Sequence, residues 1–125
     1  MAREIRDVVE AYVKLVGAGP TDDIVALYAP DAVIEDPIGT EPKQGHDAIR
    51  EFYNVIASLE RETALAPETV RIAGNHAAFV FTLITKAGGQ RMTLSPIDVM
   101  EFDDEGRITR MRAYWSADDM AVEPE

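Results

Sequence analysis

The sequence predicts a single α+β domain with three helices packed on one curved, mainly antiparallel sheet. Three segments of its first half carry apolar residues with the 3.6-residue period of a helix, whereas the second half has the two-residue period of strands. Helices followed by an antiparallel meander are typical of an α+β fold. The chain has 125 residues, which is the size of one domain. In this architecture the concave side of the sheet commonly encloses an apolar pocket.

The first two expected helices lie in the first 30 residues. The first has an apolar stripe that begins at Ile5, and Gly17 and the Gly19-Pro20 pair end it. Thr21 can cap a short second helix, whose first turn is acidic and which Pro30 ends. Its expected buried face consists of Ile24, Val25, Leu27 and Tyr28.

A short strand, Ala32 to Asp36, and a third helix after Gly45 complete the first half. The apolar face of this helix consists of Ile49, Phe52, Tyr53 and Ile56. Four strands are then expected near Ala64 to Ile72, Ala77 to Thr85, Gln90 to Phe102 and Arg107 to Trp115, with Gly, Asn or Asp in the turns. Residues 118–125 are expected to be a polar tail, so that the single domain spans residues 1–117.

The composition narrows the classes of function. Acidic residues number 23 against 12 basic residues, which gives a net charge of −11 and argues against binding to nucleic acid or membrane surfaces. The absence of cysteine excludes disulfides, zinc-thiolate sites and cysteine nucleophiles. With only His46 and His76 available, we expect no metal site. No segment has the pattern of a signal peptide or a membrane span, so we expect a cytoplasmic protein.

Asp98 interrupts the apolar pattern most clearly. It lies in the middle of the strand face that carries Met92, Leu94, Pro96, Met100 and Phe102. Burying an unpaired, ionised carboxylate costs on the order of several kcal/mol or more, so Asp98 must be paired or protonated. Backbone amides or an arginine such as Arg71 are candidate partners in a purely structural interpretation.

Asp36 and three tyrosines are further polar groups on apolar faces. Asp36 shares a strand face with apolar residues, although an aspartate before Pro-x-Gly usually bonds to the loop backbone. Tyr12 lies within the first apolar stripe, and Tyr28 and Tyr53 are expected at equivalent positions on the other two helices. The three phenols therefore either form a structural network or place at least one hydroxyl in a cavity.

These residues favour proton chemistry on an uncharged organic molecule. A carboxylate in a dry pocket can act as a base, and a neutral phenol or carboxylic acid can donate hydrogen bonds to a developing oxyanion. The apolar walls, or else plain core, would come from Phe79, Phe81 and Leu83 on one strand and Met111, Ala113 and Trp115 on another. The residues alone do not identify the substrate.

Seven blocks of the sequence, together with their spacing, match a known family. They are Val-Val-Glu-Ala-Tyr12-Val, Ile-Val-Ala-Leu-Tyr28-Ala, Glu-Asp36-Pro-Ile-Gly, Ala-Ile-Arg-Glu-Phe52-Tyr53, Ala-Phe79-Val-Phe81, Pro-Ile-Asp98-Val-Met-Glu-Phe and Met111-Arg-Ala-Tyr-Trp115. In these blocks, which run from about residue 5 to residue 116, the sequence resembles the bacterial Δ5-3-ketosteroid isomerases of the nuclear transport factor 2-like or SnoaL-like superfamily. The joint presence of Tyr12, Asp36 and Asp98 is the most specific part of the resemblance.

The resemblance implies a cone-shaped domain, a homodimer, and a deep apolar cavity for a steroid, without a cofactor. It implies that Asp36 is the general base, Tyr12 the phenol of an oxyanion hole and Asp98 the protonated acid beside it. Tyr28 and Tyr53 match positions whose hydroxyls support the catalytic tyrosine. Positions in or near the cavity are matched by Phe52, Phe79, Phe81, Met111 and Trp115.

The reaction that the resemblance implies is the conversion of a 3-oxo-Δ5-steroid into a 3-oxo-Δ4-steroid. Asp36 would move a proton from C4 to C6 through a dienolate, whose C3 oxygen would be held by Tyr12 and Asp98. This role requires Asp98 to stay protonated near neutral pH while Asp36 is ionised, so different surroundings are expected to separate their pKa values.

Two other functions remain open at this point. A dehydratase, cyclase or epoxide hydrolase of the same fold would act on another apolar metabolite, often through a histidine or an arginine–aspartate arrangement. A non-catalytic dimer that binds apolar ligands would need no buried acid. Pairing of Asp98 with an arginine, and the lack of an open cavity, would favour that last alternative.

Overall fold

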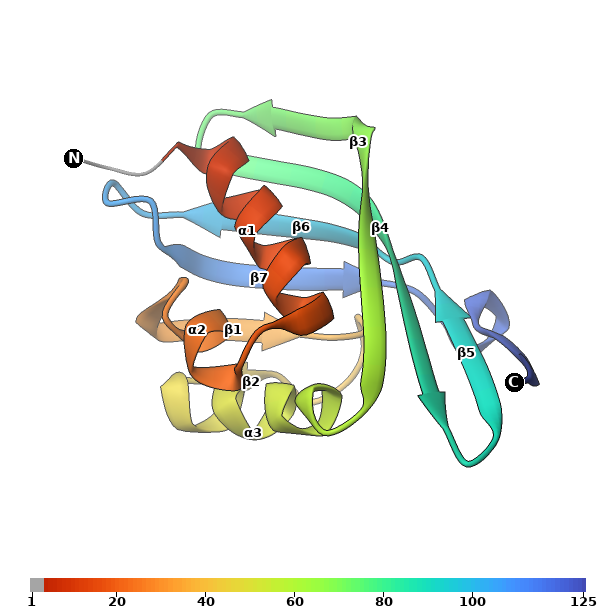
Figure 1. Ribbon diagram of the computed structural model, residues 1–125. Helices are drawn as coiled ribbons and strands as arrows, with labels where there is room; N and C mark the ends of the chain where they lie inside the picture. Colours follow the sequence, from red (N-terminus) through yellow and green to blue (C-terminus); the bar gives the residue numbers. More distant parts are fainter. Residues whose placement is uncertain (1–3) are drawn as a thin grey trace.

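The computed structural model describes residues 4–125 and confirms the α+β class (Figure 1). The helices are α1 (Ile5–Ala18), α2 (Thr21–Val25) and α3 (His46–Ala57), followed late in the chain by the short 3-10 helix η1 (Ala117–Asp119). The strands are β1 (Tyr28–Glu35), β2 (Lys43–Gln44), β3 (Glu60–Ala73), β4 (His76–Ala87), β5 (Gln90–Leu94), β6 (Ile97–Phe102), β7 (Ile108–Tyr114) and β8 (Ala121–Pro124). No helix in this described part of the chain is long and apolar enough to cross a membrane.

All eight strands belong to one curved sheet. The strand order is β2-β1-β7-β6-β4-β5-β8, with β3 paired to β4 beside this path. Every pairing is antiparallel except that of β1 with β7. The first half of β4 pairs with β6 and its second half with β5, so the sheet splits along this strand. The helices lie on one side of the sheet, α1 across its face and α3 along its β1–β2 end (Figure 1).

Helix α1 docks on the sheet through a close approach between backbones. Its helical period buries five apolar or aromatic residues, Val8, Val9, Tyr12, Val13 and Val16. Gly17 faces β3, where a Cβ atom would overlap Thr63 Oγ1. The Thr63 hydroxyl donates a 2.5 Å hydrogen bond to Val13 O. Packing therefore requires glycine at position 17. The contact with Thr63 fixes α1 on the sheet, with Tyr12 on the helix face that packs against it.

The prediction for the second helix is wrong at both ends. Pro20, not Thr21, is the N-cap residue of α2, and the helix ends at Val25. Tyr28 is the first residue of β1 and pairs with Ile108 of β7. A proline disfavours the helical conformation of the residue before it, so Pro30 favours an extended conformation at Ala29. Tyr28 thus points inward from a strand.

The second half also departs from its prediction in detail. The strand expected from Gln90 to Phe102 is divided at Ser95 and Pro96 into β5 and β6, because proline cannot donate a ladder hydrogen bond. The C-terminal segment expected as a polar tail is exposed, but Ala121–Pro124 forms β8, which pairs with β5. Its preceding turn, η1, brings Met120 to the concave side.

Candidate active site

A cavity of about 340 Å³ lies between the helices and the concave face of the sheet. Of the ten predicted site residues, seven line it: Tyr12, Asp36, Phe52, Tyr53, Phe81, Asp98 and Trp115. They come from α1, α3, β4, β6, and the segments that follow β1 and β7. The fold therefore brings together the three polar groups on which the resemblance depends, within walls that are otherwise mainly apolar.

Asp98 is a buried acid without a salt-bridge partner. It lies on β6 with 1% of its surface exposed, and its Oδ1 has no hydrogen-bond partner. Arg71, considered above as a partner, donates instead to Glu68 O and Val70 O. Burial raises the pKa of Asp98 well above its usual range, and the charge of Asp36 raises it further. Burial thus favours the protonated form of Asp98.

The three inward-facing tyrosines form one hydrogen-bonded network. Tyr53 OH lies 2.9 Å from Tyr12 OH and 2.6 Å from Tyr28 OH. Burial raises the pKa of all three phenols, so each is neutral. Tyr12 and Tyr53 line the cavity, whereas Tyr28 lies behind Tyr53. Both interpretations of the tyrosines are correct, since they form a network and part of it faces the cavity.

Asp36 follows β1 and is held by an indole. Trp115 Nε1 donates a 2.8 Å hydrogen bond to Asp36 Oδ1. The loop backbone is bound by the neighbouring carboxylate instead, because Gly39 N donates to Glu35 Oε2 at 2.9 Å. Burial raises the pKa of Asp36 above its usual range, and the Trp115 hydrogen bond and the charge of Lys43 offset only part of that rise. Asp36 therefore has support for its ionised form that Asp98 lacks.

Three predicted site residues do not line the cavity. Phe79 and Met111 are fully buried in the core. The Phe79 ring packs edge-on against Tyr12, with ring centroids 6.4 Å apart. Tyr28 contributes through Tyr53, as described above. These side chains fix the position of the wall without forming its surface.

Sequence reasoning did not assign six of the lining residues to the cavity, namely Val16, Val55, Ile56, Leu94, Pro96 and Met120. Leu83, which was expected in an apolar wall or in the core, lines the cavity as well. The helical period of α1 and the two-residue period of β4 and β5 place several of these on the inner side, so that signal was present. Met120 had no such signal, because it belongs to the segment expected as a tail. The hydrogen bond of Trp115 to Asp36 was missed as well, since Trp115 was assigned only an apolar position.

The two histidines lie outside the cavity. His46 Nε2 is 2.9 Å from Tyr28 O at the start of α3, and His76 Nε2 is 3.7 Å from Glu101 Oε1. Within residues 4–125 no group of three or more His, Cys, Asp or Glu side chains is arranged to hold a metal ion. The polar side chains that line the cavity are therefore the phenols of Tyr12 and Tyr53, the two carboxyl groups, and the Trp115 indole, whose N–H is bound to Asp36.

Comparison with known proteins gives a family and a full-length relative. The SnoaL-like domain family matches residues 9–111. A steroid Δ-isomerase of Nocardioides simplex is 45% identical over 124 residues, which cover 99% of this chain and 99% of that protein. The epoxide hydrolase LasB of Streptomyces lasalocidi is 27% identical over 120 residues, and this match covers 91% of the chain but only 42% of LasB.

Solved structures have the same fold. The epoxide hydrolase/cyclase-like enzyme SalBIII, described for its role in pyran ring formation in the polyether salinomycin, has a TM-score of 0.87 and 26% identity, with 95% of each chain covered. RV0760c of Mycobacterium tuberculosis also has a TM-score of 0.87, with 24% identity and 98% of each chain covered. At that identity the second likeness concerns the fold alone.

Proposed function

The chain belongs to the SnoaL-like domain family, and from the geometry of its cavity we propose that it is a steroid Δ-isomerase that converts 3-oxo-Δ5-steroids into 3-oxo-Δ4-steroids. The observation that carries the proposal is a buried Asp98, whose Oδ1 has no hydrogen-bond partner, in the same apolar cavity as Tyr12 and Asp36. Full-length similarity to the Nocardioides simplex steroid Δ-isomerase supports it.

Asp36 is the base in this proposal. Its carboxylate removes a proton from C4, which lies between the C3 carbonyl and the C5–C6 double bond, and leaves a dienolate. The protonated Asp36 then returns the same proton to C6, which moves the double bond into conjugation with the carbonyl. The Trp115 hydrogen bond orients the carboxylate and favours its ionised form before the reaction.

Tyr12 and Asp98 stabilise the charge on the C3 oxygen of the dienolate. Both are neutral donors in a dry environment, where hydrogen bonds to a developing oxyanion are strongest. Ionisation of Asp98 would remove its donor and repel the oxyanion. Burial thus creates this site, because it holds the proton on Asp98 at a pH where an exposed aspartate is ionised.

The tyrosine network determines which hydroxyl is free to donate. Each phenol has one proton and can accept as well as donate. If Tyr28 donates to Tyr53 and Tyr53 donates to Tyr12, the proton of Tyr12 remains available to the substrate. In this arrangement each hydrogen bond also polarises the next one towards the C3 oxygen.

A hydrolase or cyclase function is the second candidate, and it is supported by the likeness to LasB and SalBIII. Both histidines lie outside the cavity, and its two carboxyl groups have no arginine partner within residues 4–125. The donor and base arrangement therefore favours isomerisation. A non-catalytic ligand-binding role lacks its two supporting features, a paired Asp98 and a closed interior.

We also propose that the protein is a homodimer joined through the outer face of the sheet. Ile97 and Tyr114 are direct register partners there, and 49% and 45% of their surfaces are exposed. Such apolar exposure on neighbouring central strands is suited to a second copy of the same face. Sedimentation equilibrium distinguishes a dimer from the monomer that would contradict this proposal.

The test of the reaction is an ultraviolet assay of the conjugated enone formed from a side-chain-free 3-oxo-Δ5-steroid. We expect conversion by the protein and a loss of about 10²–10⁴-fold in turnover for Asp36→Asn, which removes the base and keeps the shape. Asp31→Asn, an exposed site on β1, is the matched control. Near-full turnover by Asp36→Asn would remove Asp36 from its role, and no conversion by the unaltered protein would overturn the isomerase proposal.

A further inference from the structure

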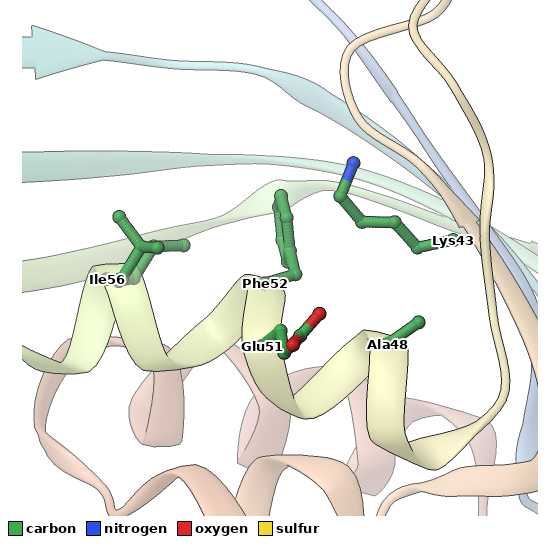
Figure 2. A pocket seen from close by; sticks show the side chains of 6 residues that line it. Lys43, Ala48, Glu51, Phe52 and Ile56 are labelled. Atoms are coloured by element: carbon green, nitrogen blue, oxygen red, sulfur yellow. The ribbon is translucent and has the colours of Figure 1, made fainter.

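A second hollow beside α3 adjoins the cavity. Its volume is about 350 Å³, and Figure 2 shows its lining from close by. It is lined by Lys43 of β2 and by Ala48, Glu51, Phe52, Val55 and Ile56 of α3, which together define the α3 groove. Phe52, Val55 and Ile56 also line the cavity. The groove and the cavity therefore meet along one stretch of the helix.

The boundary between the two hollows is open to solvent at Val55. This side chain lines both of them and is 65% exposed. Because Val55 belongs to both hollows, a ligand longer than the cavity would reach the groove past this side chain.

The groove combines an apolar floor with one unpaired cation. Ala48, Phe52 and Val55 recur at the spacing that places side chains on one face of a helix. The Lys43 ammonium lies 5.4 Å from the centre of the Phe52 ring (Figure 2). Within residues 4–125, Lys43 forms no ion pair, and its ammonium donates only a long hydrogen bond of 3.4 Å to Glu41 O.

We propose that the α3 groove binds the C17 side chain of the steroid, and that the preferred substrates carry an aliphatic side chain that ends in a carboxylate. This inference rests on the proposed isomerase function. C3 and C17 lie at opposite ends of the steroid ring system. With the C3 oxygen between Tyr12 and Asp98, C17 is at the far end of the substrate, and Val55 is an exposed residue that the cavity and the groove share.

The chemistry of the groove selects this occupant. Methylene groups gain burial against Ala48, Phe52 and Val55. A terminal carboxylate that passes over the Phe52 ring comes near the Lys43 ammonium, which forms no ion pair within residues 4–125. A hydrocarbon side chain would form no ion pair with the Lys43 ammonium.

Glu51 provides an internal control because its charge is opposite to that of Lys43. It lines the same groove and is exposed. A carboxylate bound near Lys43 is attracted by one of these side chains and repelled by the other. Neutralising them should therefore change the affinity for an acidic substrate in opposite directions, which a structural role of the groove would not produce.

The experiment compares kcat/KM for 3-oxo-Δ5-steroids that share one ring system. One has no side chain, and the others carry a five- or eight-carbon side chain that ends in a carboxylic acid or in its primary amide. The quantity of interest is the acid-to-amide ratio of kcat/KM. Because the charge of Lys43 also lowers the pKa of Asp36, its replacement alters the chemistry of every substrate. The ratio cancels that effect.

We expect Lys43→Gln to lower the ratio by about two- to fivefold, the range of an exposed ion pair, and Glu51→Gln to raise it. Lys14→Gln on α1 removes the same charge away from the groove and should leave the ratio unchanged, which controls for long-range steering. A ratio that Lys43→Gln leaves unchanged at both chain lengths would overturn the inference, while turnover of the side-chain-free steroid would still support the isomerase. Failure to convert any of these steroids would overturn both.

Discussion

Asp98 illustrates how the environment of one residue can define its chemistry. The same carboxyl group would be an anion on the surface, but on β6 it is buried without a cation or a backbone donor at Oδ1. Desolvation therefore favours its protonated form. Burial also raises the pKa of Asp36 in the same cavity, but the hydrogen bond from Trp115 and the nearby charge of Lys43 offset part of that rise. In the proposed mechanism the two identical side chains therefore have opposite roles.

Replacement of Asp98 tests whether the donated proton is what matters. We expect Asp98→Ala to lower kcat by about 10²–10³-fold, the usual effect of losing one oxyanion donor. Asp98→Asn should lose less, because the amide still donates a hydrogen bond. Steady-state kinetics by the enone assay measures both, with thermal unfolding as a check on folding. An Asn variant as damaged as the Ala variant would indicate that donation by this residue is not the cause.

At the scale of elements, the C-terminal ends of α1 and α3 are joined by one guanidinium. Arg61 on β3 donates through Nε to Val16 O at 2.7 Å and through Nη2 to Gly19 O at 2.7 Å. Its Nη1 donates to Ala57 O at 3.2 Å, at the end of α3. The last carbonyl groups of a helix lack intrahelical partners, and a cation there also interacts favourably with the helix dipole. Arg61 thereby fixes the two helices that carry Tyr12 and Tyr53.

Loss of the Arg61 hydrogen bonds to the ends of α1 and α3 should reduce the stability of the fold. Arg61→Met keeps the aliphatic stem and leaves three carbonyl groups without their donor, so we expect the free energy of unfolding to fall by about 1–3 kcal/mol. Arg110→Met, at a half-exposed arginine on β7, is the matched control and should change it by no more than about 0.5 kcal/mol. Urea unfolding followed by circular dichroism measures both. Equal effects of the two substitutions would argue against a stabilising role of the Arg61 hydrogen bonds.

The elements that the sequence predicts well are those with a long, regular apolar pattern. The stripe of α1 and the alternating faces that place Asp98 among apolar residues are both present in the structure. Local pattern fails where pairing with a distant strand decides the conformation. Tyr28 continues the helical apolar pattern that begins at Ile24, yet its pairing with Ile108 makes it part of a strand. The hydrogen bond from Trp115 to Asp36 joins residues 79 positions apart, and no local pattern reports such a contact.

At the scale of the whole molecule, the role proposed for Asp98 opposes the stability of the fold. The fold must exclude water from this carboxyl group to keep it neutral, and the same exclusion makes its ionisation unfavourable. The apolar core around it supplies that environment, with Phe79 and Ala113 as its register partners on the neighbouring strands. The protein therefore holds a titratable group whose charge the folded state tolerates less than the unfolded chain does.

This conflict predicts how stability depends on pH. The pKa of Asp98 is raised in the folded state, so the folded protein binds its proton more tightly than the unfolded chain does. The corresponding stabilisation is complete below the ordinary pKa of an aspartate, about 3.9, and is lost as pH rises from there to the raised pKa of Asp98. Between these two values the free energy of unfolding should fall by up to about 1.4 kcal/mol per pH unit relative to Asp98→Asn, which does not titrate. Urea unfolding of both proteins across this range measures the difference, and two parallel pH profiles would mean that Asp98 does not hold its proton through burial.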